Sequence, residues 1–230
     1  MTETLSLRAK IEQSPMGAYQ WMIVVMAAIM NLLDGFDVLA LAFTATAIRG
    51  EFGLTGIELG YLLSAGLFGM TAGSLFLAPL ADKIGRRPLL LMAVSLSAIG
   101  MLGSAFISQY QWLGFWRVIT GLGVGGILVG TNVITSEYSS RKWRSFAISV
   151  YAAGFGIGAV LGGMFAVMLQ GEYGWRSVFL AGAILTGLLL VVLFIWLPES
   201  IDFLTSKQPK NAEMRLNLIA QKIGLAGDWK

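Results

Sequence analysis

Six long apolar stretches in the sequence limit what the chain can fold into. Each contains at least 20 residues, and a helix of about 20 residues crosses a hydrocarbon core of about 30 Å. With 56% hydrophobic and 13% charged residues, a soluble fold would expose more apolar surface than water tolerates. We therefore expect an all-α integral membrane protein with six transmembrane helices, at Trp21–Thr46, Ile57–Leu80, Pro88–Ile107, Trp112–Thr135, Phe146–Leu169 and Val178–Leu197.

Polar residues divide the chain into three regions around these stretches. We expect a cytoplasmic N-terminal segment at 1–20, a six-helix transmembrane bundle at 21–197 and a cytoplasmic segment at 198–230. Within the last region, Asn211–Gly224 carries its apolar residues on one side, which predicts a short amphipathic helix.

The basic residues predict how the chain is oriented in the membrane. If the chain crosses the membrane six times, the loops on the side away from both termini contain only two basic residues, Arg49 and Arg176. The other side receives Arg8, Lys10, Lys83, Arg86, Arg87, Arg141, Lys142, Arg144 and the basic residues after Leu197. The positive-inside rule then places both termini in the cytoplasm. Because the net charge of +3 is spread over short loops, it indicates a lipid bilayer as partner and no nucleic acid.

Cysteine and histidine are both absent from the chain. Their absence excludes disulfides and most of the usual metal sites and catalytic arrangements. The apolar stretches also contain no serine–lysine pair of the kind that membrane-embedded hydrolases use. We therefore expect no enzyme, no metal site and no cofactor.

Two aspartates, Asp34 and Asp37, lie within the first apolar stretch. A charge near the bilayer centre costs about 2.5–3.5 kcal/mol or more, so two of them one helical turn apart indicate a function. Movement of a polar solute across the membrane is the function that this placement favours. Without histidine, a proton carried near neutral pH must sit on a carboxylate that desolvation keeps protonated, which points to the same two residues.

Glycines recur every four residues in several of the stretches, as at Gly69 and Gly73 and at Gly154, Gly158 and Gly162. This spacing lets helix backbones approach closely and predicts helix packing, with no role in phosphate binding. An acid–glycine–arginine turn follows both the second and the fifth stretch, at 82–87 and 172–176. Such a recurrence on opposite sides of the membrane indicates an inverted repeat of three helices plus three.

Several motifs resemble those of a known family. Ala78–Arg87 is similar to the loop signature of the major facilitator superfamily, G-x-L-A-D-[RK]-x-G-R-R, with alanine in place of the first glycine. Arg117–Gly123 resembles the R-x-x-x-G-x-G of its fourth span, and Pro198–Ser200 resembles the P-E-S that closes its sixth. Asp34–Asp37 reads D-G-F-D and resembles the D-G-[FY]-D of its aromatic acid:proton symporters.

The resemblance implies a proton-coupled symporter of the bacterial inner membrane. Such a protein imports aromatic or related carboxylates, for example benzoate, hydroxybenzoate or muconate, driven by the proton gradient. The chain would be the N-terminal bundle of a twelve-span fold, ending in the central loop. Transport then requires a second six-span half or a self-associated pair. A natural truncation, a split half and an excerpt of a longer chain all fit this length.

Two alternatives remain open from the sequence. One is a major facilitator transporter for another cargo, such as a sugar, a non-aromatic organic acid or an exported drug. The other is a truncated remnant that does not transport. Ala159 stands where the superfamily's antiporter motif has proline, and this departure favours symport over exchange.

The resemblance also implies roles for particular residues. Because spans one and four adjoin in this fold, Asp34, Asp37 and Arg117 are expected to share one polar cluster, where Arg117 offers a planar fork to a carboxylate. The aromatic rings of Phe36, Phe43 and Tyr61 are candidates for contact with the substrate. A gating role on the cytoplasmic side is expected for Asp82, Gly85, Arg86 and Arg87, and for the acid and arginine of the next loop, Glu137 and Arg144.

Overall fold

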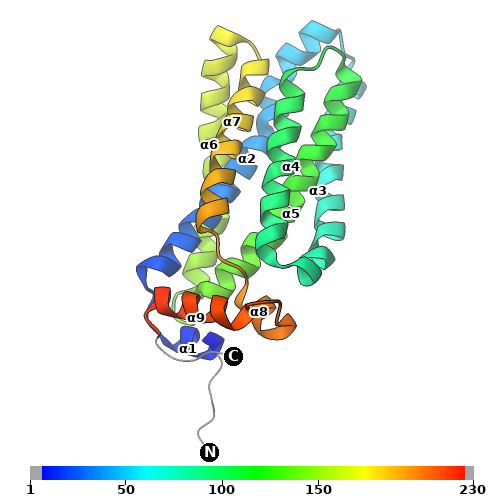
Figure 1. Ribbon diagram of the computed structural model, residues 1–230. Helices are drawn as coiled ribbons and strands as arrows, with labels where there is room; N and C mark the ends of the chain where they lie inside the picture. Colours follow the sequence, from blue (N-terminus) through cyan, green and yellow to red (C-terminus); the bar gives the residue numbers. More distant parts are fainter. Residues whose placement is uncertain (1–6, 226–230) are drawn as a thin grey trace, which may run out of the picture.

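The computed structural model of the chain is a bundle of long helices with short helices across one end (Figure 1). It describes residues 7–225, so the outermost parts of the predicted terminal segments, 1–6 and 226–230, lie outside the described residues. The helices are α1 (Leu7–Gln13), α2 (Ala18–Phe52), α3 (Gly56–Ile84), α4 (Arg86–Ala105), α5 (Tyr110–Tyr138), α6 (Arg144–Tyr173), α7 (Arg176–Trp196), α8 (Ile201–Lys207) and α9 (Ala212–Ile223).

Six helices, α2 to α7, are long and apolar enough to cross a membrane. Residues 7–225 contain no strand. The predicted all-α membrane fold is therefore confirmed. The helices extend beyond the apolar stretches at several ends, because polar residues there still form helix and cap it. For example, Gly53 ends α2 in the left-handed conformation (φ 64°), and Thr55 and Glu58 form a reciprocal capping box at the start of α3.

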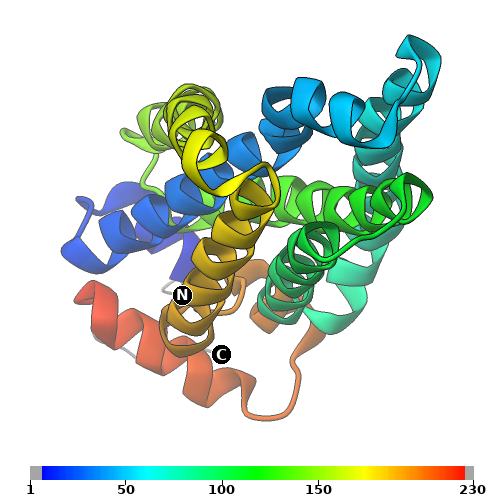
Figure 2. The ribbon, with the colours of Figure 1, turned by 90° about the horizontal axis from the view of Figure 1, so that it is seen from above.

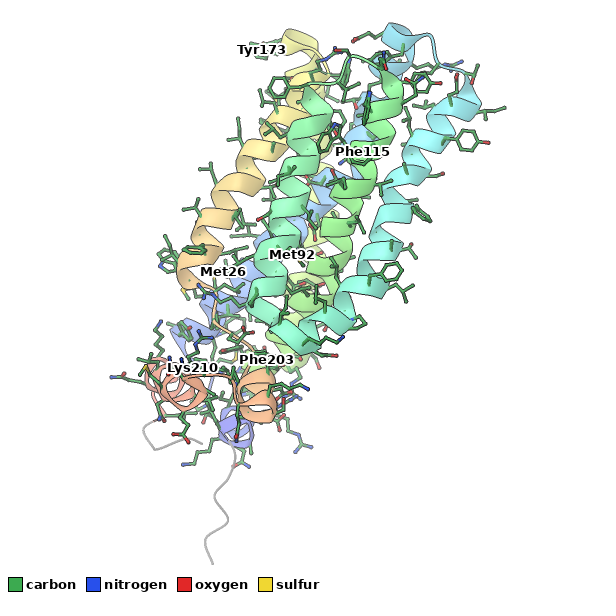
Figure 3. All side chains as sticks on the ribbon, turned by 45° about the vertical axis from the view of Figure 1, so that its right-hand side comes forward. Met26, Met92, Phe115, Tyr173, Phe203 and Lys210 are labelled. Carbon is green, nitrogen blue, oxygen red and sulfur yellow. The ribbon has the colours of Figure 1, made fainter. Side chains whose placement is uncertain are left out.

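The short helices all lie at one end of the bundle, which we call the basic end. It comprises α1, α8, α9, the α3–α4 turn at Gly85 and the α5–α6 loop at 139–143, and the two described chain ends meet there (Figure 1). In the side-chain view Phe203 and Lys210 lie at this end, whereas Tyr173 lies at the opposite end (Figure 3).

Glycines decide which helices pack most closely. A Cβ atom on Gly35 would overlap the backbone of Phe155 in α6, and one on Gly158 would overlap the backbone of Leu32 in α2. The same kind of contact, from Gly69 and Gly73, joins α3 to α5. The glycine spacing therefore does mark helix packing, as predicted. Viewed along the bundle, α3 and α6 lie at its periphery (Figure 2), and only 17% of the most apolar segment of each helix is buried.

Two of the helix contacts correspond to each other under the predicted inverted repeat. The repeat relates α2, α3 and α4 to α5, α6 and α7, in that order. It therefore relates the α3–α5 contact to the α6–α2 contact, and these are the two most extensive contacts in the bundle. The turn glycines also correspond, since Gly85 (φ 104°, ψ 160°) ends α3 and Gly174 (φ 77°, ψ 168°) ends α6. Only glycine adopts this backbone conformation without strain.

Candidate functional site

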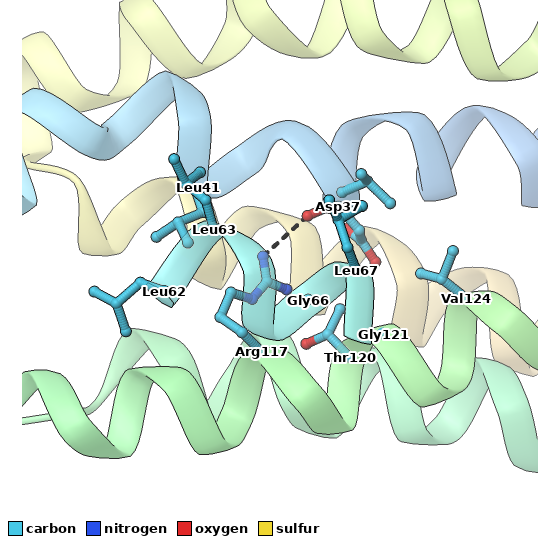
Figure 4. A pocket seen from close by; sticks show the side chains of 11 residues that line it. Asp37, Leu41, Leu62, Leu63, Gly66, Leu67, Arg117, Thr120, Gly121 and Val124 are labelled. Atoms are coloured by element: carbon cyan, nitrogen blue, oxygen red, sulfur yellow. Dashed lines mark hydrogen bonds between the residues drawn. The ribbon is translucent and has the colours of Figure 1, made fainter. Parts of the chain in front are cut away.

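A narrow cavity of about 30 Å³ lies between α2, α3 and α5 (Figure 4). Its polar lining comes from Asp37 of α2 and from Arg117 and Thr120 of α5. The remaining lining is small or apolar and consists of Val38, Leu41, Leu62, Leu63, Gly66, Leu67, Gly121 and Val124. The structure thus brings together two of the three charged residues that the sequence predicted to cluster.

The Arg117 guanidinium is buried, with 3% of the residue exposed. Its Nη1 donates to the backbone oxygen of Asp37 at 3.0 Å, and its Nη2 donates to the sulfur of Met101 at 3.2 Å. Its carbon Cζ lies 5.3 Å from the centroid of the Phe179 ring, a cation–π contact. Among the described residues, no carboxylate lies within ion-pair distance of this cation, and its Nε has no hydrogen-bond partner.

The Asp37 carboxylate is also buried, with 1% of the residue exposed. Its Oδ2 accepts a hydrogen bond of 2.6 Å from the hydroxyl of Ser97 in α4, whereas its Oδ1 has no donor in the described part of the chain. The cavity therefore contains a guanidinium that forms no ion pair among the described residues, beside a carboxylate with an unused acceptor. Buried groups of this kind are costly unless a ligand or proton satisfies them.

Asp34 is equally buried but does not line this cavity. Residues three apart on a helix point in directions about 60° apart, so the Asp34 side chain points in a different direction from that of Asp37. Three residues earlier in α2, the Asn31 side chain donates to the backbone oxygen of Tyr151 in α6 at 2.8 Å. The phenol of Tyr151 interacts electrostatically with Asp34. The Asp34 Oδ2 has no hydrogen-bond partner within residues 7–225. The expected cluster of three charges is thus divided between two neighbouring polar groups.

The three predicted aromatic residues also lie outside the cavity lining. Phe36 is buried against α6 and α7, where Cβ atoms on Gly162 and Gly182 would lie 2.5 and 2.9 Å from its ring. Phe43 lies beside Gly163 of α6. Tyr61, by contrast, is 72% exposed on α3.

The predicted gating loop joins α3 to α4 at the basic end. Asp82 and Arg86 form an ion pair with a 2.5 Å separation between Oδ1 and Nη2. The backbone nitrogen of Arg87 donates to Glu199 at 3.0 Å. Gly85 is required here because its φ is positive and because a Cβ atom would lie 2.5 Å from the Glu199 carboxylate. The P-E-S segment that follows α7 is therefore what holds this loop.

Glu137 and Arg144 take different partners in the structure. The buried Glu137 carboxylate accepts hydrogen bonds from the Ser200 hydroxyl at 2.8 Å and from the Ile201 backbone at 2.8 Å. Arg144 instead donates to Glu12 of α1 at 2.6 Å, and this contact holds the pKa of the Glu12 carboxyl below its usual range. Each of the two residues thus secures a different short helix, α8 or α1, to the bundle.

Comparison with known proteins identifies the family. The model of the Major Facilitator Superfamily matches residues 27–222. The chain belongs to this superfamily. The gallate transporter of Pseudomonas putida is 37% identical over 198 residues, which cover 86% of this chain and 44% of that protein. The 4-hydroxybenzoate transporter PcaK of the same species is 34% identical over 216 residues, or 94% and 48% of the two chains.

A solved major facilitator structure shows the same fold. The proton:xylose symporter XylE superimposes with a TM-score of 0.80 at 22% identity, over 90% of this chain and 50% of XylE. The chain spans about half the length of the curated relatives that it matches. Membership in the superfamily confirms the predicted resemblance. It also confirms the prediction that the chain is no enzyme. Together with the six apolar helices, it shows that the chain is a multi-pass membrane protein. Major facilitator transporters generally need no cofactor.

The sequence did not indicate that Ser97, whose hydroxyl donates to Asp37 beside the cavity, belongs to the candidate site. A polar residue inside an apolar stretch is a signal, but membrane helices commonly bond serine to their own backbone. Ser95 and Ser104 of α4 do so, donating to Leu91 and Gly100. Residue type therefore could not single out Ser97 as the partner of Asp37.

Proposed function

We propose that this chain is the N-terminal half of a proton-coupled symporter that imports aromatic or related carboxylates, such as benzoate, hydroxybenzoate or muconate. The observation that carries the proposal is the buried Arg117 guanidinium, which lines a cavity beside Asp37 but forms no ion pair within 4 Å in the described chain. A substrate carboxylate supplies the missing anion and accepts two parallel hydrogen bonds from the planar fork. The names of the gallate and 4-hydroxybenzoate transporters support the cargo class.

We assign the coupled proton to Asp37. Its carboxylate shares the cavity with Arg117, and Oδ1 is available to hold the proton. A protonated Asp37 leaves the positive charge of Arg117 unopposed for the incoming carboxylate, whereas an ionised Asp37 competes with it. Proton and substrate then enter together, driven by the proton gradient. Asp34 lies one turn away and serves as the neighbouring carboxylate of the proton route.

A second six-span half, or a second copy of this chain, completes the binding site. The cavity of about 30 Å³ is far smaller than the ~300–1,000 Å³ of typical ligand pockets, so these residues form one wall of a larger site. The exposed apolar faces of α3 and α6 supply surface for that partner. Tyr61, exposed on α3, is then placed to contact the aromatic ring of the substrate, while Phe36 packs behind Asp37.

The basic end is proposed to face the cytoplasm of a bacterium, with the chain in the inner membrane. Lys and Arg gather at this end, which the positive-inside rule associates with the cytoplasmic side. Asp82, Gly85, Arg86 and Arg87, together with Glu137 and Arg144, then form the cytoplasmic gate. Residues 1–20 and 198–230 are the flanking cytoplasmic segments, and α9 leads into the second half.

Uptake measurements test this proposal. The chain is joined to its cognate second half, and uptake of radiolabelled benzoate, 4-hydroxybenzoate and xylose is compared. We expect uptake of the aromatic acids and not of xylose. Arg117→Lys keeps the charge but loses the planar fork, so KM should rise about tenfold, or about 1.4 kcal/mol. The matched control is Arg49→Lys, at an exposed arginine outside the cavity. Xylose uptake, or an unchanged KM in Arg117→Lys, contradicts the proposal.

A further inference from the structure

A second crevice lies at the basic end, separate from the Arg117 cavity. Its volume is about 220 Å³, and it lies where the end of α7 meets α9 and the first turn of α2. Figure 1 shows α9 across this end of the bundle. Three cations line the crevice, Arg87, Arg215 and Lys222, together with a single carboxylate, Glu199.

The carboxylate in this crevice does not neutralise the cations. Glu199 accepts hydrogen bonds from the backbone nitrogens of Arg87 and Ser200, at 3.0 and 2.9 Å. Arg215 and Lys222 form no ion pair within residues 7–225, and the Nε of Arg87 is buried without a partner. The crevice therefore has an excess of positive charge and suits an anion.

The same crevice is also apolar, and this decides the kind of anion. Arg215, Leu218, Ile219 and Lys222 follow the i, i+3, i+4, i+7 spacing of one helix face. Leu218 lies between the two cations and is 51% exposed. Trp196, at the end of α7, is 56% exposed, and tryptophan concentrates where a membrane meets water. Positive charge beside exposed apolar surface suits an amphiphilic anion.

We propose that this crevice binds the headgroup phosphate of an anionic phospholipid. Arg87, Arg215 and Lys222 contact the phosphate, because cations near a membrane surface attract anionic lipids. The acyl chains extend past Trp196 along the exposed apolar face of α7. The bound lipid secures α9 against the end of the bundle, in the leaflet that the basic end faces. The proposal does not depend on transport, so it can be tested without a substrate.

Thermal unfolding in nanodiscs tests the lipid site on the full chain. Phosphatidylcholine discs with and without phosphatidylglycerol are compared, and we expect phosphatidylglycerol to raise the midpoint by about 4 °C. The double variant Arg215→Gln/Lys222→Gln should lose most of this rise. The control Lys207→Gln/Lys210→Gln removes the same charge from exposed positions outside the crevice and should keep the rise. Both pairs are exposed, so neither variant disturbs the core.

Four outcomes overturn the proposal. Equal losses in both double variants indicate general surface attraction, and an unchanged rise in Arg215→Gln/Lys222→Gln indicates binding elsewhere. Inorganic phosphate added to phosphatidylcholine discs must not reproduce the rise, because an equal effect would assign the crevice to a free anion. Native mass spectrometry of Lys222→Gln provides a second readout, in which fewer retained phosphatidylglycerol molecules than in wild type support the site and an equal number contradicts it.

Discussion

Asp34 and Asp37 lie less than one helical turn apart but have different neighbours. Asp37 faces α4 and α5, where Ser97 holds its carboxylate and Arg117 shares its cavity. Asp34 lies beside Tyr151 of α6. Two carboxylates this close cannot both ionise cheaply, so their separate surroundings allow one to carry a proton and the other to stay charged. The two residues are therefore expected to respond differently to the same substitution.

We predict that Asp37→Asn and Asp34→Asn, in the joined transporter, both abolish accumulation of substrate against a gradient. Asp37→Asn should still exchange labelled for unlabelled substrate, because a permanently neutral residue resembles the protonated state. Asp34→Asn should lose exchange as well. Counterflow and accumulation assays in vesicles measure the two activities. The control is Glu213→Gln, at an exposed acid of α9. Normal accumulation by both asparagine variants would show that the aspartates have only structural roles.

At the scale of elements, close helix contact explains the glycine of the D-G-F-D sequence. Gly35 touches the backbone of α6 directly, and Gly158 makes the reciprocal contact with α2. Lipid offers little hydrophobic drive for helix association, so close backbone packing supplies much of the stability of such a pair. The α2–α6 contact thereby fixes the rotation of α2, and with it the directions of Asp34 and Asp37.

Two glycines of α6 provide a matched test of this packing. Gly158→Ala places a methyl group against the Leu32 backbone, and overpacking of this kind costs about 1–3 kcal/mol. The unfolding midpoint in detergent should fall by several degrees, at about 2–4 °C per kcal/mol. Gly156→Ala, which meets no atom within 4 Å, should not lower the midpoint, because alanine is more favourable than glycine in a helix interior. Equal midpoints for the two variants would argue against close α2–α6 packing.

At the scale of the whole molecule, the corresponding acids at the two ends of the bundle differ in burial. At the opposite end, Glu51 of α2 pairs with Arg176 of α7 at 2.7 Å, but about 40% of each side chain is exposed. Exposed ion pairs contribute about 0–1 kcal/mol. At the basic end, the corresponding acid of α5, Glu137, is buried with hydrogen bonds from Ser200 and Ile201. The acid at the opposite end is therefore the more exposed of the two corresponding acids.

Cysteine labelling tests which end faces the cytoplasm. The chain has no cysteine of its own, so single cysteines are introduced at Lys83 in the last turn of α3 and at Gly56 at its start. Both positions are exposed, and a side chain at Gly56 meets no atom within 4 Å. A membrane-impermeant maleimide added to intact cells should label Gly56→Cys and not Lys83→Cys. Permeabilised cells, in which both sites must react, are the control, and the reverse pattern would invert the orientation.

The sequence alone was sufficient to determine the class of this protein and its six membrane-spanning helices. Membrane spans depend on the length of apolar stretches, which is a local property, and α2 to α7 lie where the six stretches predicted them. Glycine spacing is also local, and it correctly marked the contacts of Gly69 and Gly158. The short motifs were specific enough to indicate the superfamily that the comparisons show.

Only the tertiary structure decided which side chains meet. Helical periodicity places Asp34 and Asp37 on one broad face, but it does not say which neighbouring helix each side chain reaches. The close contact of α2 with α6 sets that rotation, so Asp37 joins Ser97 and Arg117 while Asp34 does not. Such pairings depend on the relative rotation and position of helices that are distant in sequence, and no local pattern contains that information.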